Sequence, residues 1–291
     1  MADWITISND RLTAAINPLG AELSSLRDAD GRELMTDADP QFWRGRAPLL
    51  FPVVGQPSGD TIRVDGQAYP MKKHGFARRM MFTEVERGAE HVQFRLTDDA
   101  ETRARYPFAF RLDVAFRLSG ATLSTEVTVA NPADTPLPAS FGFHPAFAWP
   151  LPFGRDRADH RLTFVADEPD SLRVIADDGT IAADKRPTPL DGRTLRLTDA
   201  LFARDALVWD HVRSDRVTYG ASDGPRLEIA FPDTPMLGVW TKPGARYVCV
   251  EPWHGIADPE GFTGEFRDKP GVFEVAPGGE KRIAMSVTLV G

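Results

Sequence analysis

The sequence predicts an all-β protein, and three observations lead to this prediction. Hydrophobic and polar residues alternate with a period of two in many segments, which is typical of half-buried antiparallel strands. Asp-Gly dipeptides lie where hairpins would reverse, and helical periodicity is weak. No linker, composition shift or internal repeat divides the chain. Residues 1–291 are therefore expected to form a single β-sandwich-like domain of mostly antiparallel strands, about twenty if strand lengths are typical.

The alternating segments can be placed in chain order. In each of them the apolar residues occupy every second position, so one face of the strand would pack on the core. The segments that show this alternation are 92–96, 112–118, 123–129, 227–231 and 283–289.

Turns and helices are expected only as short connections. Hairpin turns are predicted at Asp65-Gly66, Asp178-Gly179 and Asp223-Gly224, because the two residue types tolerate the positive φ values that tight hairpins need. Single helical turns are predicted at 39–43 and 198–202, the second with Thr198 as its N-cap.

Composition excludes several classes of protein. The net charge of −8 and pI of about 5.3 argue against nucleic acid as the main partner, because neutralising phosphates needs a basic surface. The one cysteine, Cys249, excludes an internal disulfide framework. No apolar run is long enough to span a bilayer, and residues 1–4 lack a signal-peptide pattern. We therefore expect a cytoplasmic protein without a membrane partner.

The most informative segment is 246–258, which joins a strand to a carboxylate and aromatic residues. Alternation along the strand 246–251 places Glu251 on one face with Tyr247 and Cys249. Pro252 cannot donate to a ladder and is expected to end the pairing. A carboxylate beside the indole of Trp253 is typical of sugar-handling sites, because the ring covers apolar C–H surface while the carboxylate takes a proton.

Four further side chains are candidates for a site. Arg46 follows an aromatic pair, His74 and Arg78 lie in a basic run that contains a glycine, and His144 lies at an apolar strand end before a proline. Each also has a structural interpretation. His144 would then be a hydrogen-bonded core residue, His74 a solvated one and Arg46 part of a surface ion pair.

Other chemistries lack their motifs. His74, His144, His254 and Glu251 could in principle form a metal site. Closely spaced histidine pairs of the metal-binding kind are missing, however, so no metal is predicted. The nucleophile elbow, the P-loop and the dinucleotide fingerprint are missing as well.

Five segments in order make the chain resemble the aldose 1-epimerase (galactose mutarotase-like) family, in its LacX-like branch. The resemblance runs from about Ile7 to the C-terminus and rests on the set as a whole. The segments are Gly20-Ala21-Glu22-Leu23, Gly45-Arg46-Ala47-Pro48, His74-Gly75-Phe76-Ala77-Arg78, His144-Pro145-Ala146-Phe147 and Glu251-Pro252-Trp253-His254-Gly255.

The resemblance implies a β-supersandwich with a sugar cleft and no metal or organic cofactor. It also implies that His144 is the general acid and Glu251 the general base. His74 would orient the sugar, and Arg46 would hydrogen-bond its hydroxyls.

An aspartate is also implied by the resemblance. Asp205 and Asp210 are both candidates, with Asp210 favoured. Trp253 or Trp240 would stack on the sugar, whereas Trp43, Phe76 and Phe147 are assigned to the core. Arg78, with Lys72 and Lys73, resembles the basic residues of the hexose-6-phosphate branch.

The predicted function is mutarotation of a hexose, the small-molecule partner of the chain. In this reaction one group takes a proton from the anomeric hydroxyl and another gives one to the ring oxygen. The alternatives are a hexose-6-phosphate 1-epimerase and a non-catalytic carbohydrate-binding protein, because β-sandwiches host many functions. A polysaccharide lyase or glycoside hydrolase would use a different set of acids.

Overall fold

The computed structural model describes residues 4–291 and confirms the all-β prediction. It contains twenty-four strands, one short α-helix (α1, Ala100–Arg103) and five 3₁₀ turns in this part of the chain. Every strand pairing is antiparallel apart from a few isolated bridges. The first three residues, on which the signal-peptide prediction partly rests, lie outside the described residues.

The larger of the two main sheets has nine strands. The predicted strands at 92–96, 112–118, 123–129, 227–231 and 283–289 all belong to it. In spatial order its strands are β17 (Thr194–Arg196), β14 (Arg161–Phe164), β19 (Arg216–Gly220), β20 (Arg226–Ala230), β24 (Glu280–Val290), β10 (Thr122–Ala130), β9 (Arg111–Ser119), β8 (His91–Thr97) and β7 (Thr83–Arg87).

The second main sheet has eight strands and contains most of the candidate residues. β22 lies near its middle, with β21 on one side and both β12 and β13 on the other. In spatial order its strands are β16 (Ile181–Arg186), β15 (Leu172–Ile175), β18 (Leu207–Trp209), β21 (Met236–Trp240), β22 (Tyr247–His254), β12 (Phe141–Phe143) and β4 (Leu49–Leu50), with β13 (Ala146–Ala148) also paired to β22.

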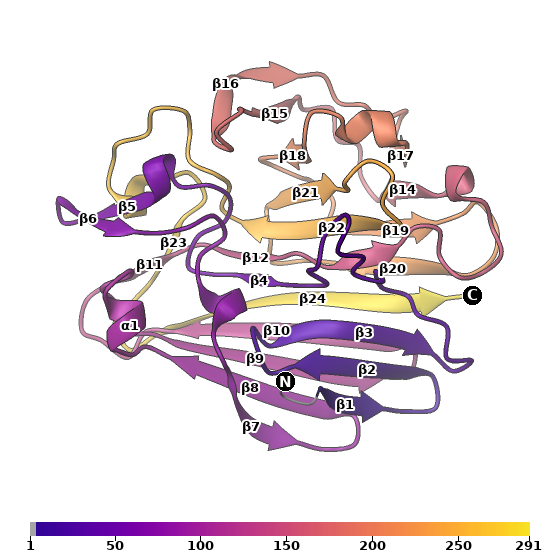
Figure 1. Cartoon of the computed structure of the whole chain (residues 1–291), viewed down its shortest axis with the longest axis horizontal. Coiled ribbons are helices and arrows are strands. Elements are labelled where there is room, and N and C mark those ends of the chain that lie inside the picture. Colours follow the sequence, from indigo (N-terminus) through magenta and orange to yellow (C-terminus); the bar gives the residue numbers. More distant parts are fainter. Residues whose placement is uncertain (1–3) are drawn as a thin grey trace.

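Three small sheets complete the structure. They are β1 (Ile5–Ser8) with β2 (Leu12–Asn17) and β3 (Glu22–Asp28), β5 (Thr61–Val64) with β6 (Gln67–Pro70), and β11 (Leu137–Ala139) with β23 (Phe273–Val275). Figure 1 shows the strands stacked from β16 at the top to β7 at the bottom, with β1–β3 in front of the lower strands.

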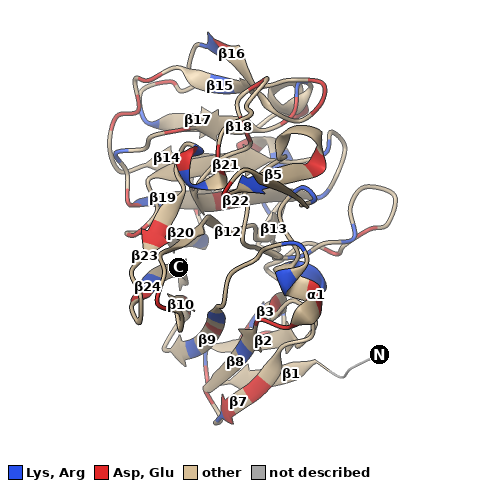
Figure 2. Cartoon of the chain, turned by 90° about the vertical axis from the view of Figure 1, so that its left-hand side faces the viewer, with Lys and Arg blue, Asp and Glu red and all other residues tan. Residues whose placement is uncertain are grey.

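The core lies between the two main sheets. Its largest buried cluster includes Phe116 and Val127 from the nine-stranded sheet and Phe147, Val248 and Val250 from the eight-stranded sheet. Figure 2 shows that the positions of basic and acidic residues are interspersed along the chain. Within residues 4–291, no helix has the length and apolar character needed to cross a membrane.

The predicted turns form as expected, whereas one predicted cap does not. Asp65 and Gly66 have φ values of 51° and 78°, so both are in the left-handed region that this two-residue hairpin requires. The 3₁₀ turn Asp199–Phe202 follows Thr198, but the Thr198 side chain makes no capping hydrogen bond. The turn is stabilised by backbone hydrogen bonds instead, such as Leu201 N–H to the Thr198 carbonyl.

The prediction that Pro252 ends the pairing of its strand is wrong. β22 continues to His254, and Pro252 lies opposite Leu237 of β21. The Val250 N–H points away from β21 and donates to the Pro145 carbonyl at 3.2 Å. Because residues two apart face the same edge, the missing N–H of Pro252 also faces away from β21, toward the interruption between β12 and β13. No bond to β21 is therefore lost.

Candidate active site

The site begins with the two faces of β22. Val248 and Val250 point into the main core, while Tyr247 and Cys249 belong to a separate small cluster on the opposite face. Glu251 shares that second face and is 2% exposed. The alternation predicted from the sequence therefore holds, and it brings a carboxylate to a buried surface outside the main core.

His144 reaches the same place from a neighbouring interruption in the sheet. β12 ends at Phe143 and β13 begins at Ala146, so His144 and Pro145 lie between two strands that both pair with β22. The His144 Nε2 atom lies 3.1 Å from the Glu251 Oε2 atom. Two residues more than 100 positions apart in the chain thus form a close acid–base pair.

This pair borders a cavity of about 290 Å³. That volume is near the lower end of the range of about 300–1,000 Å³ found for small-molecule sites. The cavity is lined by apolar, aromatic and charged side chains and by two glycines, which are Trp43, Gly55, Lys73, His74, Arg78, His144, Ile175, Gly179, Ile181, Asp205, Ala206, Val208, Trp240, Glu251, Trp253, Ile256 and Ala257.

Burial sets the protonation of the pair. It raises the pKa of Glu251 well above its usual range, with Lys73 opposing the rise and Asp205 adding to it. It lowers the pKa of His144 to about 3. Both shifts disfavour the charged forms, because each group has lost its water. Burial therefore favours the state in which the pair carries no net charge and one proton is available to the carboxylate or to Nε2.

His74 is fixed by a strained turn. Its φ is 66°, and the next residue, Gly75, approaches the Phe51 carbonyl so closely that a Cβ at Gly75 would lie 2.1 Å from that oxygen. The Gly55 N–H donates to His74 Nδ1 at 3.1 Å. Burial holds the pKa of His74 well below its usual range, so the ring is neutral and carries its proton on Nε2. The His74 and His144 ring centroids are 5.8 Å apart.

Three tryptophans form aromatic walls of the cavity. The Trp253 indole packs over Gly142 and Gly238, where an added Cβ would come within 2.6 Å and 2.4 Å of the ring. The Trp43 ring lies 4.9 Å from His144 and 5.6 Å from Trp240, centroid to centroid. Trp43, which the sequence assigned to the core, therefore lines the cavity, whereas Phe76 and Phe147 are core residues as expected.

Of the two candidate aspartates, Asp205 lines the cavity and the favoured Asp210 does not. Asp210 Oδ2 accepts a hydrogen bond from Arg173 Nε at 2.5 Å in a neighbouring cavity. The difference follows from the register of β18, in which Leu207 pairs with Val239. The residues before β18 lie beside the Trp240 end of β21, and those after it lie beside the Met236 end.

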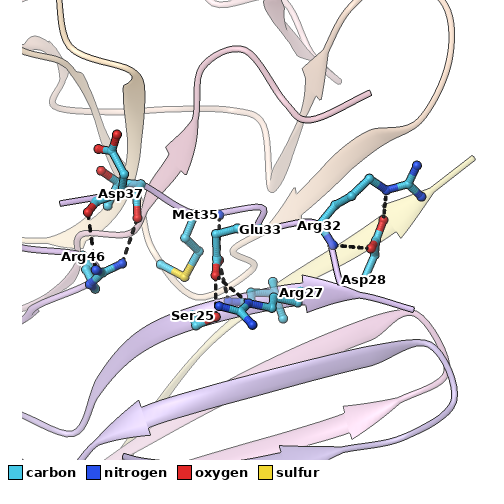
Figure 3. A network of polar contacts seen from close by, with 10 residues as sticks. Ser25, Arg27, Asp28, Arg32, Glu33, Met35, Asp37 and Arg46 are labelled. Carbon is cyan, nitrogen blue, oxygen red and sulfur yellow. Dashed lines mark hydrogen bonds and ion pairs between the residues drawn. The ribbon is translucent and has the colours of Figure 1, made fainter. Parts of the chain in front are cut away.

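The structure does not bring Arg46 to the cavity. Its Nη1 donates to the Thr36 carbonyl at 2.9 Å, and Nη2 faces the Asp37 carbonyl at 3.5 Å (Figure 3). Its backbone N–H donates to the Glu22 carboxylate at 2.8 Å. Arg46 therefore holds the connection between β3 and β4 in place.

Basic side chains lie along another part of the cavity wall. Arg78 and Lys73 line it, and Arg78 Nη2 donates to the Lys73 carbonyl at 3.0 Å. Burial lowers the pKa of Arg78 to about 10, and it remains charged at neutral pH. Lys72 points elsewhere and pairs with Asp60 at 2.5 Å.

Two residues at this site, Trp43 and Cys249, were not expected there from the sequence, whereas Lys73 and Asp205 were among its candidates. Trp43, Lys73 and Asp205 line the cavity, and Cys249 lies against the acid–base pair. For Cys249 the available signal was the alternation of β22, which places it beside Glu251. For Asp205 and Trp43 the signal is the pairing register of distant strands.

Known proteins resemble this chain over nearly its whole length. A family model described as Aldose 1-epimerase matches residues 3–269. The plasmid and chromosomal LacX proteins of Lactococcus lactis subsp. lactis are each 31% identical over 296 residues, covering 98% of this chain and 99% of theirs.

Solved structures give the same result. A galactose mutarotase related enzyme from Lactobacillus acidophilus has a TM-score of 0.92 at 30% identity, covering 99% of this chain and 97% of its own. A galactose mutarotase-like protein from Lactobacillus casei has a TM-score of 0.91 at 30% identity, covering 99% of this chain and 100% of its own.

Proposed function

Because the chain belongs to the aldose 1-epimerase family, we propose that it interconverts the α and β anomers of a hexose by acid–base ring opening and closure. The observation that carries this proposal is the His144 Nε2–Glu251 Oε2 pair, 3.1 Å apart at the edge of a cavity of about 290 Å³. The anomeric oxygen O1 and the ring oxygen O5 are both bonded to C1, so two adjacent groups can serve both.

The single proton of the pair is enough for the reaction. With the proton on His144, Glu251 takes the O1 proton while His144 gives its proton to O5, and the C1–O5 bond breaks. The products are the open-chain aldehyde and a pair whose proton now lies on Glu251. Rotation about C1–C2 and the reverse transfers close the ring on the other face and restore the pair.

The other cavity residues would bind the sugar. The neutral His74 offers an Nε2–H donor, and Asp205 and Arg78 offer an acceptor and a donor. The indole rings of Trp253 and Trp240 would cover apolar C–H surface. Arg46, which the family resemblance made a binding residue, is not part of this proposal.

The test is mutarotation of freshly dissolved α-D-glucose, α-D-galactose and glucose 6-phosphate, followed by polarimetry or NMR exchange. Glu251→Gln and His144→Asn should each lower the rate by at least about 10²-fold, because each removes one proton-transfer group. His211→Asn is the matched control, since His211 is exposed and does not line the cavity. Near-wild-type rates with either cavity variant on the preferred sugar would contradict the assignment.

The same variants separate an enzyme from a carbohydrate-binding protein. If Glu251→Gln loses turnover but still binds the sugar in calorimetry, the pair is catalytic. If the wild type binds a sugar without accelerating its mutarotation, the binding-protein alternative is correct.

A phosphorylated hexose is the second candidate substrate, favoured by Lys73 and Arg78 on the cavity wall. Lys73→Gln should then raise KM for glucose 6-phosphate and leave KM for free glucose nearly unchanged. Lys72→Gln is the matched control, because Lys72 pairs with Asp60 outside the cavity. Equal effects of Lys73→Gln on both sugars would count against a phosphate site.

A further inference from the structure

Three buried side chains that are typical metal ligands meet beside the cavity. The ligand atoms of His144, Cys249 and Glu251 all lie within 4.8 Å of one another. Cys249 is 0% exposed, Glu251 is 2% exposed and His144 is 7% exposed. Among residues 4–291 this is the one group of three or more histidine, cysteine or acidic side chains with this proximity.

The arrangement of strands explains why they meet. Cys249 and Glu251 are two residues apart on one face of β22, so their side chains are neighbours. Cys249 lies opposite Ala146 of β13, a small residue that follows directly on the His144-Pro145 interruption. The thiol therefore lies close to both the imidazole and the carboxylate.

The spacing is close to that of a tetrahedral zinc site. Bonds of about 2.0–2.3 Å to nitrogen, oxygen and sulfur place the ligand atoms of such a site about 3.3–3.6 Å apart. His144 Nε2 and Glu251 Oε2 are already 3.1 Å apart. The widest separation in the group is at most 4.8 Å, so small side-chain rotations bring Cys249 Sγ into range.

We infer that His144, Cys249 and Glu251 bind Zn²⁺ or another borderline-soft divalent cation, with the fourth position facing the cavity. Imidazole, thiolate and carboxylate are the donors that zinc takes in proteins, and three of them with one open position is a common set. Because the ion occupies the lone pairs of both His144 and Glu251, it blocks the acid–base reaction. This last consequence rests on the proposed function; the binding itself does not.

The binding test uses the metal-free full chain titrated with Zn²⁺ in a calorimeter. We expect one ion per chain, and Cys249→Ala should weaken binding by at least about 100-fold, since changes outside the coordination sphere already cost about 10–100-fold. His91→Asn is the control, because His91 and Glu86 form a partly exposed pair that can hold a weakly bound ion. Weak binding that only His91→Asn removes would overturn the inference.

Cobalt gives an independent readout. Co²⁺ bound to the wild type should show a thiolate-to-metal charge-transfer absorption in the near ultraviolet, which is absent from Cys249→Ala. This measurement on the wild type decides the question even if the variant folds poorly. A bound cobalt ion without that absorption would show that Cys249 is not a ligand.

Activity completes the test. Zn²⁺ should stop mutarotation by the wild type, a chelator should restore it, and Cys249→Ala should keep most of its turnover and resist the ion. Full activity at saturating Zn²⁺ would refute the inhibition. If the wild type accelerates no sugar, the proposed function fails while calorimetry and cobalt absorption still decide the metal site.

Discussion

At the scale of single residues, Glu251 and His144 are a source of instability as well as the proposed catalysts. Burial disfavours the charged form of each group. The folded protein is therefore less stable at any pH at which the group would be charged in the unfolded chain. Above pH 4.5 the unfolded chain ionises Glu251, whereas burial keeps a proton on the folded pair. The contribution of this raised pKa to stability is therefore present at low pH and is lost as the pH rises.

This linkage predicts that Glu251→Gln becomes relatively more stable as the pH increases. The difference in free energy of unfolding between variant and wild type should grow by about 1.4 kcal/mol per pH unit above pH 4.5, up to the pKa of the folded pair. Denaturant unfolding at several pH values measures it. A difference that stays constant from pH 5 to pH 8 would show that Glu251 is ionised in the folded protein without a bound proton on His144.

At the scale of elements, the cavity depends on two loops that are joined by a buried ion pair. Lys269 Nζ lies 2.9 Å from Asp258 Oδ1 and donates to the Val54 carbonyl at 3.2 Å. Asp258 Oδ2 accepts the Ser58 N–H at 2.9 Å. The pair thus ties the loop after β22 to the loop that contains Gly55, the residue whose N–H fixes the tautomer of His74.

Lys269→Met should destabilise the protein by about 3–5 kcal/mol, because it leaves the Asp258 carboxylate buried without a counter-charge. The double variant with Asp258→Asn should recover much of that loss. Arg282→Met, which breaks an exposed pair with Glu280, should leave the free energy of unfolding nearly unchanged. Chemical denaturation compares all three, and a cost for Lys269→Met as small as that for Arg282→Met would refute this account.

At the scale of the whole molecule, local patterns in the sequence were enough to predict the strands but not their pairing. Period-two alternation identified five strands of the nine-stranded sheet and the face of β22 that carries Glu251, because both depend on neighbouring residues. The choice of Asp210 over Asp205 failed because it depends on which strand end lies beside Trp240. The place of Arg46 also depends on a distant segment, the carbonyls of Thr36 and Asp37.

The assignment of Trp43 to the core failed for a related reason. No motif distinguishes Trp43 from a core aromatic residue, and only the three-dimensional packing shows that its ring lies against His144 and borders the cavity. Proximity of His144 and Glu251 came from the family resemblance, since nothing local links residues so far apart in the chain.

The two-sided burial of β22 limits how this chain can vary. From Tyr247 to Trp253 every residue is buried, because one face packs on the main core and the other on the small cluster of Tyr247 and Cys249 and on the cavity. A strand at the surface accepts changes at every second position, whereas this one leaves no permissive position for seven residues. In a library of all single substitutions, most changes at each position from 247 to 253 should therefore reduce the stability of the protein. Changes in ligand preference would have to arise from substitutions in the surrounding loops.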